Sequence, residues 1–328
     1  MKNLTSNFAK SFYVIAILSI AFTNCKKTED TKTDQVVDKQ EMMKEPFFKL
    51  SLAQWSLHRA ITEDKTHDPL DFATKAKEMG FEGIEYVSGL YTLHIDNMGM
   101  QAVLDTLKAR SEEIGIENLL IMIDGEGDLA SPDEKDRDEA VEKHKKWVDA
   151  AQFLGCHSIR VNLFGTRDSD IWVDASTDGL VKLSQYAATK NINVLVENHG
   201  YLSSNADLLK MVMMKVEMAN CGTLPDFGNF CLEKEGGERW GAKCIKEYDR
   251  YVGVTKLMPW AKAVSAKSHD FDENGNETKT DYVKMLQIVK DAGYKGYIGV
   301  EYEGSILSEE DGIKATRDLL IKASKSLN

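Results

Sequence analysis

Cysteine is scarce in this sequence. Its 328 residues contain 5 cysteines, and no two of them form a CxxC pair. This count excludes a disulfide-dense scaffold, and the missing pair argues against a closed zinc site made of cysteines. Cys221, Cys231 and Cys244 lie close enough in sequence for one pair to be oxidised outside the cytoplasm, and the spacing leaves open which pair it is.

The sequence also lacks an apolar run long enough to span a bilayer, which needs about 20 residues, in its N-terminal segment. The run Phe12–Phe22 follows Lys2 and Lys10 and has the pattern of a signal peptide. A small residue, a polar residue and Cys25 come next, where a bacterial lipoprotein signal is cleaved. We therefore expect residues 1–24 to be removed and Cys25 to be lipidated. The alternative is an ordinary cleaved signal with a chance cysteine.

Aromatic residues are absent from the segment that follows, which is highly charged and has few apolar side chains. Such a composition cannot bury enough surface to offset the entropy of ordering. Residues 25–45 are predicted to be a flexible tether. The protein is then expected to lie outside the cytoplasm, facing the periplasm or the cell surface, and to contact a membrane through its lipid anchor only.

Basic residues are outnumbered by acidic ones, 41 against 53, and the formal net charge is −12. This balance argues against a nucleic-acid partner. No Pro-, Gly- or Ser-rich break divides residues 46–328, which we expect to form a single domain. Nothing in the sequence indicates an oligomeric state.

Short β-rich runs alternate with helical patterns along that domain, as in repeated βα units. In the run DPLDFATKAKEMG, for example, Asp68 suits a helix cap, Pro69 the first turn and Gly80 the C-terminal stop. Eight units predict a (β/α)8 TIM barrel, an α/β fold, although an open sheet of similar units would give the same pattern. The expected strands are residues 49–55, 83–87, 117–122, 158–162, 193–197, 221–225, 263–268 and 296–301.

Polar side chains gather at the predicted C-terminal strand ends, where such barrels carry their active sites. Four of them each follow or end an apolar run: Glu197, Asp226, His269 and Glu301. Carboxylates held together without a cation would repel each other, so we expect one divalent metal ion, Mn²⁺, Mg²⁺, Co²⁺ or Zn²⁺. Each acid taken alone could be a solvated loop residue, which is our interpretation of Glu126, Asp128 and Glu303.

Four motifs, VLVENHG, TLPDFGNF, AKSHDFD and IGVEYEG, carry a resemblance to a known family. From Leu50 to Leu320 the chain resembles the xylose-isomerase-like, sugar phosphate isomerase/epimerase superfamily. The resemblance implies that Glu197, Asp226, His269 and Glu301 bind one divalent metal ion. It also implies that Glu197 and Glu301 move the proton, as the two glutamates do in ketose 3-epimerases.

The sequence departs from that family at two positions. Relatives often read His-x-Lys-Asp on strand seven, and direct alignment of KSHD puts Lys267 at the ligand position. Lys267 and His269 are two residues apart and share a strand face. We assign His269 as the ligand because a neutral imidazole binds metal and an ammonium does not. Lys267 is then an electrophile beside a substrate oxygen, or a buried lysine paired with a glutamate. The second departure is Asn229, which stands three residues after Asp226 where many relatives have a histidine.

These groups suit proton abstraction next to a carbonyl, with Glu197 and Glu301 as the acid–base pair. His199 is expected to bind a substrate hydroxyl, assist the proton transfer or orient a ligand. The leading hypothesis is a sugar isomerase or epimerase acting on an unphosphorylated sugar, since no phosphate cradle follows strands seven and eight. The alternatives are a lyase or hydrolase acting by β-elimination on keto-glycosides, and a non-catalytic carbohydrate-binding lipoprotein.

Overall fold

The computed structural model describes residues 45–239 and 241–327. The predicted signal peptide, Cys25 and nearly all of the predicted tether lie outside these residues. The main sheet is built from strands β1 Lys49–Ala53, β2 Gly83–Val87, β3 Glu117–Met122, β4 Ser158–Val161, β5 Asn193–Glu197, β6 Cys221–Leu224, β9 Val264–Ser268 and β10 Tyr297–Tyr302. The predicted strands agree with these bounds to within a residue or two.

The eight strands are parallel and run in the order β6-β5-β4-β3-β2-β1-β10-β9. The two edge strands also meet. The Ser265 N–H donates to the Pro225 carbonyl at 3.0 Å, and the Phe227 N–H donates to the Ser265 carbonyl at 3.0 Å. These bonds join β9 to the end of β6, so the sheet closes and the predicted barrel is confirmed.

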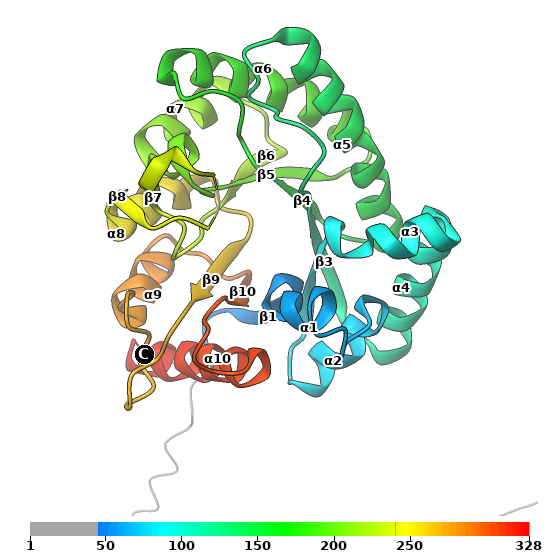
Figure 1. Cartoon of the computed structure of the whole chain (residues 1–328). Coiled ribbons are helices and arrows are strands. Elements are labelled where there is room, and N and C mark those ends of the chain that lie inside the picture. The colour runs from blue at the N-terminus through cyan, green and yellow to red at the C-terminus, as the bar shows by residue number, and fades with distance from the viewer. Residues whose placement is uncertain (1–44, 240, 328) are drawn as a thin grey trace, which may run out of the picture. The chain divides into compact units, whose positions relative to one another are not determined.

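Helices surround the sheet (Figure 1). The α-helices of the described residues are α1 His58–Thr62, α2 Phe72–Glu78, α3 Thr92–Met98, α4 Met100–Ile114, α5 Glu134–Leu154, α6 Ser169–Ala188, α7 Ala206–Val216, α8 Arg250–Leu257, α9 Tyr282–Asp291 and α10 Glu309–Ser326. Asp68 accepts a hydrogen bond from the Leu70 N–H, as predicted for a cap, and Gly80 has a φ of +85°. Across the described residues, no helix combines the length and apolarity that a membrane crossing requires.

The alternation of side chains along each strand separates two environments. Outward-facing side chains pack beneath the helices in the main hydrophobic core. Inward-facing residues form a smaller apolar cluster in the barrel, which includes Leu120, Met122, Leu195 and Leu224. Glu197 lies two residues beyond Leu195 and therefore faces inward, at the carboxyl end of the strand.

A disulfide-linked hairpin is inserted after the sixth barrel strand. Strands β7 Cys231–Lys234 and β8 Cys244–Glu247 pair antiparallel, and Cys231 is bonded to Cys244. Cys221 is a free, buried thiol. The pair that the spacing left open is therefore Cys231 with Cys244.

Candidate active site

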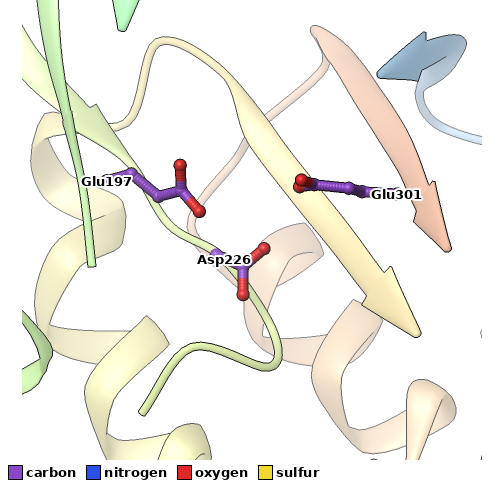
Figure 2. Close-up of side chains that lie close together, drawn as sticks. All are labelled: Glu197, Asp226 and Glu301. Atoms are coloured by element: carbon purple, nitrogen blue, oxygen red, sulfur yellow. The ribbon is translucent and has the colours of Figure 1, made fainter. Parts of the chain in front are cut away.

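Three carboxylates converge at the carboxyl end of the barrel. Glu197 ends β5, Asp226 follows β6 and Glu301 lies in β10. One oxygen from each carboxylate lies within 4.8 Å of the others, and the side chains point toward one another (Figure 2). All three side chains are buried. The structure thus brings together three of the four predicted metal ligands.

Two buried cations contact this cluster without neutralising it. Arg160 Nε lies 2.9 Å from a Glu197 oxygen, and Lys267 Nζ lies 3.2 Å from Glu301 Oε1. Each cation also pairs with a further acid, Arg160 with Asp124 at 3.1 Å and Lys267 with Glu303 at 2.7 Å. The cluster therefore keeps an excess of negative charge in a buried position, where charge is costly.

The excess negative charge contributes to a raised pKa of Asp226. Burial, together with the negative charges of Glu197 and Glu301, raises the pKa of Asp226 to about 8, against the pull of Lys267. Burial also raises the pKa of Glu301. A divalent cation would remove this cost, and oxygen donors from three elements can hold one. The residues present therefore fit a divalent metal ion.

Strand seven differs from the sequence prediction. In the described residues, His269 is not part of the carboxylate group. Its backbone N–H donates to the Glu277 carboxylate at 3.3 Å. β9 ends at Ser268, so strand alternation does not extend to His269. The inward positions are Ser265 and Lys267. Aligning SAKS with the His-x-Lys-Asp tetrad places Ser265 at the ligand position, and ligation by His269 stays a prediction that this geometry does not support.

Lys267 is held as a buried ammonium. Burial alone would lower its pKa, but Glu301 and Glu303 outweigh burial and raise the pKa well above the usual value. Gly228 gives the side chain room, since a Cβ there would lie 3.2 Å from Lys267 Cγ. The predicted pairing with a glutamate is present, and the retained positive charge is also what an electrophile requires.

Three participants were given no role at this site in the sequence analysis. Ser265 contacts two of the carboxylates, and Arg160 contacts the third. The interpretation of Glu303 as a solvated loop acid is wrong, because it accepts a hydrogen bond from Lys267. Burial works against ionisation of Glu303, but Lys267 dominates and lowers its pKa to about 2. Alternation along the strands was the available signal for Ser265, which lies two residues before Lys267.

A cavity of about 1090 Å³ opens beside the cluster and is lined by Glu301, Glu303, Arg160 and His199. Burial, and then the charges of Arg160 and Lys267, lower the pKa of His199 to about 4. At neutral pH its imidazole is therefore uncharged and can donate one hydrogen bond and accept another.

Aromatic side chains form another part of the cavity wall. Trp55 and Phe164 line the cavity, and the Arg239 guanidinium lies 4.4 Å from the Phe164 ring centre. Arg239 belongs to the loop between β7 and β8 and pairs with Asp128 at 3.2 Å. The disulfide-linked hairpin therefore supplies part of the wall of this cavity.

A fourth buried carboxyl group lies inside the barrel, on β2. Glu85 accepts a hydrogen bond from Ser51 at 2.6 Å, and its other oxygen has no partner in the described part of the chain. A Cβ at residue 299 would lie 2.5 Å from the first oxygen, so Gly299 makes room for Glu85. Burial raises the pKa of Glu85 from 4.5 to about 8, although the Ser51 hydrogen bond opposes the shift.

Glu85 makes the stability of the metal-free protein depend on pH. The folded pKa is above the ordinary value, so its contribution is complete below the ordinary pKa and is lost as the pH rises through about 8. We expect Glu85→Gln to reduce the fall in unfolding free energy between about pH 5 and about pH 9, by on the order of a few kcal/mol. Urea unfolding in chelator measures this. Glu310→Gln, at an exposed position of α10, is the control and should keep the wild-type pH dependence of the unfolding free energy. If Glu85→Gln also keeps it, Glu85 is not the group responsible.

The chain is similar to known proteins both in sequence and in fold. The chain is 44% identical over 48 residues to the 3'-dehydrocarminate deglycosidase alpha subunit of Microbacterium sp, a match covering 15% of this chain and only 14% of that protein. An L-ribulose 3-epimerase structure superimposes with a TM-score of 0.66 at 13% identity, covering 85% of this chain and 97% of that one.

Two further structures share the fold. The 3-keto-D-glucoside 4-epimerase of E. coli gives a TM-score of 0.63 at 15% identity over 84% of this chain and 99% of its own. A xylose isomerase-like protein from Mycobacterium smegmatis, in complex with magnesium, gives 0.57 at 16% identity over 85% and 97%. The family model for xylose isomerase-like TIM barrels matches residues 73–323. With the closed barrel and the carboxylate cluster at its mouth, this match shows that the chain belongs to the xylose isomerase-like TIM barrel family.

Proposed function

We propose that this protein is a metal-dependent sugar isomerase or epimerase that removes a proton next to a carbonyl group. The observation that carries the proposal is the buried group Glu197, Asp226 and Glu301. It lies at the catalytic end of the barrel, and Glu301 faces a cavity large enough for a sugar. The neutral imidazole of His199 and the ammonium of Lys267 add a hydrogen-bonding group and a fixed positive charge.

Each side chain around the cluster has its own role in the proposed reaction. A divalent ion bound there supplies Lewis acidity that stabilises negative charge on a substrate oxygen. Glu301 lines the cavity and is the base that takes the proton. Glu197 is held by Asn229 at 2.9 Å and by Arg160, so its carboxylate has a fixed orientation, from which it returns the proton as the partner of Glu301. His199 lines the cavity and binds a substrate oxygen, and the charge of Lys267 acts on the site through Glu301 and Glu303.

The size of the cavity and two of the similarities favour a second candidate function. A volume of about 1090 Å³ is at the upper end of the roughly 300–1,000 Å³ range of small-ligand pockets, so the cavity can hold a sugar together with an attached group. A deglycosidase subunit matches over a short part of its sequence, and a keto-glucoside epimerase shares the fold. The same proton abstraction on a keto-glycoside would then lead to β-elimination of the attached group. A carbohydrate-binding role without chemistry is the third candidate.

Loss of one ligand tests the metal requirement. Asp226→Ala removes the carboxylate that accepts from the Gly228 and Asn229 N–H groups, but Asn198 still holds the backbone of Asp226 and Asn229 through three hydrogen bonds. We expect Asp226→Ala to fold, to bind divalent metal at least about tenfold more weakly and to lose most activity. Elemental analysis and calorimetric titration with Mn²⁺ measure this. A wild-type protein without metal, whose activity withstands chelators, would refute the proposal.

We also propose that the protein is exported and anchored through lipidated Cys25. The Cys231–Cys244 disulfide supports this, because such bonds persist in oxidising compartments. Wild-type protein is expected to incorporate a radioactive fatty acid, and Cys25→Ala to incorporate none. Equal labelling of both proteins, or no labelling of the wild type, would rule the anchor out.

A further inference from the structure

Ser265 lies among the three carboxylates, fully buried on β9. Its hydroxyl oxygen is 2.6 Å from Asp226 Oδ2 and 2.9 Å from Glu301 Oε2. These acids come from opposite sides of β9, one after β6 and one in β10, and Ser265 is the side chain that joins them. The hydroxyl therefore sits where the ligands from the last three barrel strands meet.

The two contacts exceed what one hydroxyl can satisfy by itself. A serine hydroxyl has one hydrogen and can donate it to only one of the two carboxylate oxygens. The other contact then needs either a proton on the carboxyl group or a cation between the two oxygens. A cation shared by these oxygens would stabilise both contacts, and the hydroxyl lone pairs could also bind it. The arrangement points to a cation bound by Ser265 together with the carboxylates.

The remaining oxygens of these acids are already engaged. Glu301 Oε1 faces Lys267 Nζ at 3.2 Å, and Asp226 Oδ1 accepts from the Gly228 and Asn229 N–H groups at 2.8 and 2.7 Å. This leaves Glu301 Oε2 and Asp226 Oδ2 directed at Ser265. Within the described residues, the clustered ligand atoms are all carboxylate oxygens, with no imidazole or thiolate among them.

We propose that Ser265 Oγ is a metal ligand and that, with Glu197, Asp226 and Glu301, it forms an all-oxygen site favouring hard divalent ions such as Mg²⁺ and Mn²⁺. Oxygen-only sites suit these ions, whereas Zn²⁺ gains most from imidazole and thiolate ligands. The inference rests on the proposed function, because the site is the same one. It adds a ligand and a metal selectivity to that site.

Ser265→Cys tests the position of the side chain, because it replaces the hydroxyl by a thiol of similar shape. The metal-free full chain is titrated with Cd²⁺, Zn²⁺ and Mn²⁺ by calorimetry and by ultraviolet absorption. A thiolate within the coordination sphere should give a new Cd²⁺–sulfur charge-transfer band. The preference for Zn²⁺ over Mn²⁺ should rise at least about tenfold relative to wild type. Ser265→Ala should weaken Mn²⁺ binding about tenfold while circular dichroism stays unchanged.

Ser268→Cys is the matched control. Ser268 is buried on the same strand but faces outward, with its hydroxyl 2.5 Å from that of Thr316. This variant should show no new Cd²⁺ band and the wild-type metal preference. Wild-type binding of Mn²⁺ with no band and no change of preference in Ser265→Cys would overturn the inference and leave the proposed function intact. A wild-type chain that binds none of the three ions would overturn both.

Discussion

Replacing Glu301 by Gln is expected to slow proton exchange at the substrate carbon by about 10²- to 10⁴-fold, the contribution typical of a general base. Glutamine keeps the size of the side chain and can still accept from Ser265, but it cannot take a proton. Deuterium incorporation from D₂O into a keto-sugar, followed by mass spectrometry, measures the step even when turnover is slow. If the metal ion is also lost, the decrease is larger, so metal content is measured on the same samples.

Glu113→Gln on the exposed face of α4 is the control and should exchange deuterium at the wild-type rate. Exchange that survives in Glu301→Gln would remove Glu301 from its role and leave Glu197 or His199 as the base. The products separate the candidate functions. An epimer or an aldose–ketose pair indicates isomerisation, and a released alcohol with an enone indicates elimination. Tight sugar binding without exchange over a broad panel would indicate a binding protein.

Lys267→Met is expected to have the largest effect on the stability of the metal-free protein. Lys267 pairs with Glu301 and Glu303, and removing one partner of a buried ion pair costs about 3–5 kcal/mol. Methionine fills a similar volume against Gly228 but leaves both acids without their cation. The loss should be smaller when Mn²⁺ is present, because a bound ion compensates the charge of Glu301 and its binding stabilises the folded state.

Urea unfolding in chelator and in Mn²⁺ measures both effects. Lys262→Met is the control, since Lys262 precedes β9 and its side chain packs against Gly222 near the start of β6, away from the cluster. It should unfold at nearly the wild-type urea concentration. A Lys267→Met protein as stable as wild type in chelator would show that the two ion pairs contribute nothing to folding. Mn²⁺ affinity that falls in the variant would show that Lys267 assists the ion rather than competing with it.

Much of the fold could be predicted from the sequence, because a barrel strand has a local pattern. Each strand is a short apolar run followed by polar residues, and the period of the helices between them differs from that of the strands. Glu197 and Glu301 could be placed for the same reason, since each ends such a run. Asp226 follows a proline that closes the sixth run, and the structure confirms its place in the carboxylate cluster.

The errors concern the face on which His269 lies and the contacts between side chains of neighbouring strands. Lys267 and His269 would share a face only if β9 continued through both residues, and it ends between them at Ser268. Ser265 has no charge or reactivity that marks it, and its role depends on carboxylates from two other elements. Glu303 looked solvated because its partner Lys267 lies 36 residues away in sequence. Such pairings follow from the register of neighbouring strands, which one sequence does not specify.

The hairpin closed by Cys231 and Cys244 places part of the cavity wall on a different segment from the carboxylates. Its loop provides Arg239 to the cavity wall, whereas the barrel strands and the loop after β6 provide the carboxylates. The disulfide ties the base of the insertion, so mutations in the loop can accumulate with little effect on the barrel. A substitution in the loop can therefore change which molecules fit the cavity while the carboxylate cluster stays the same.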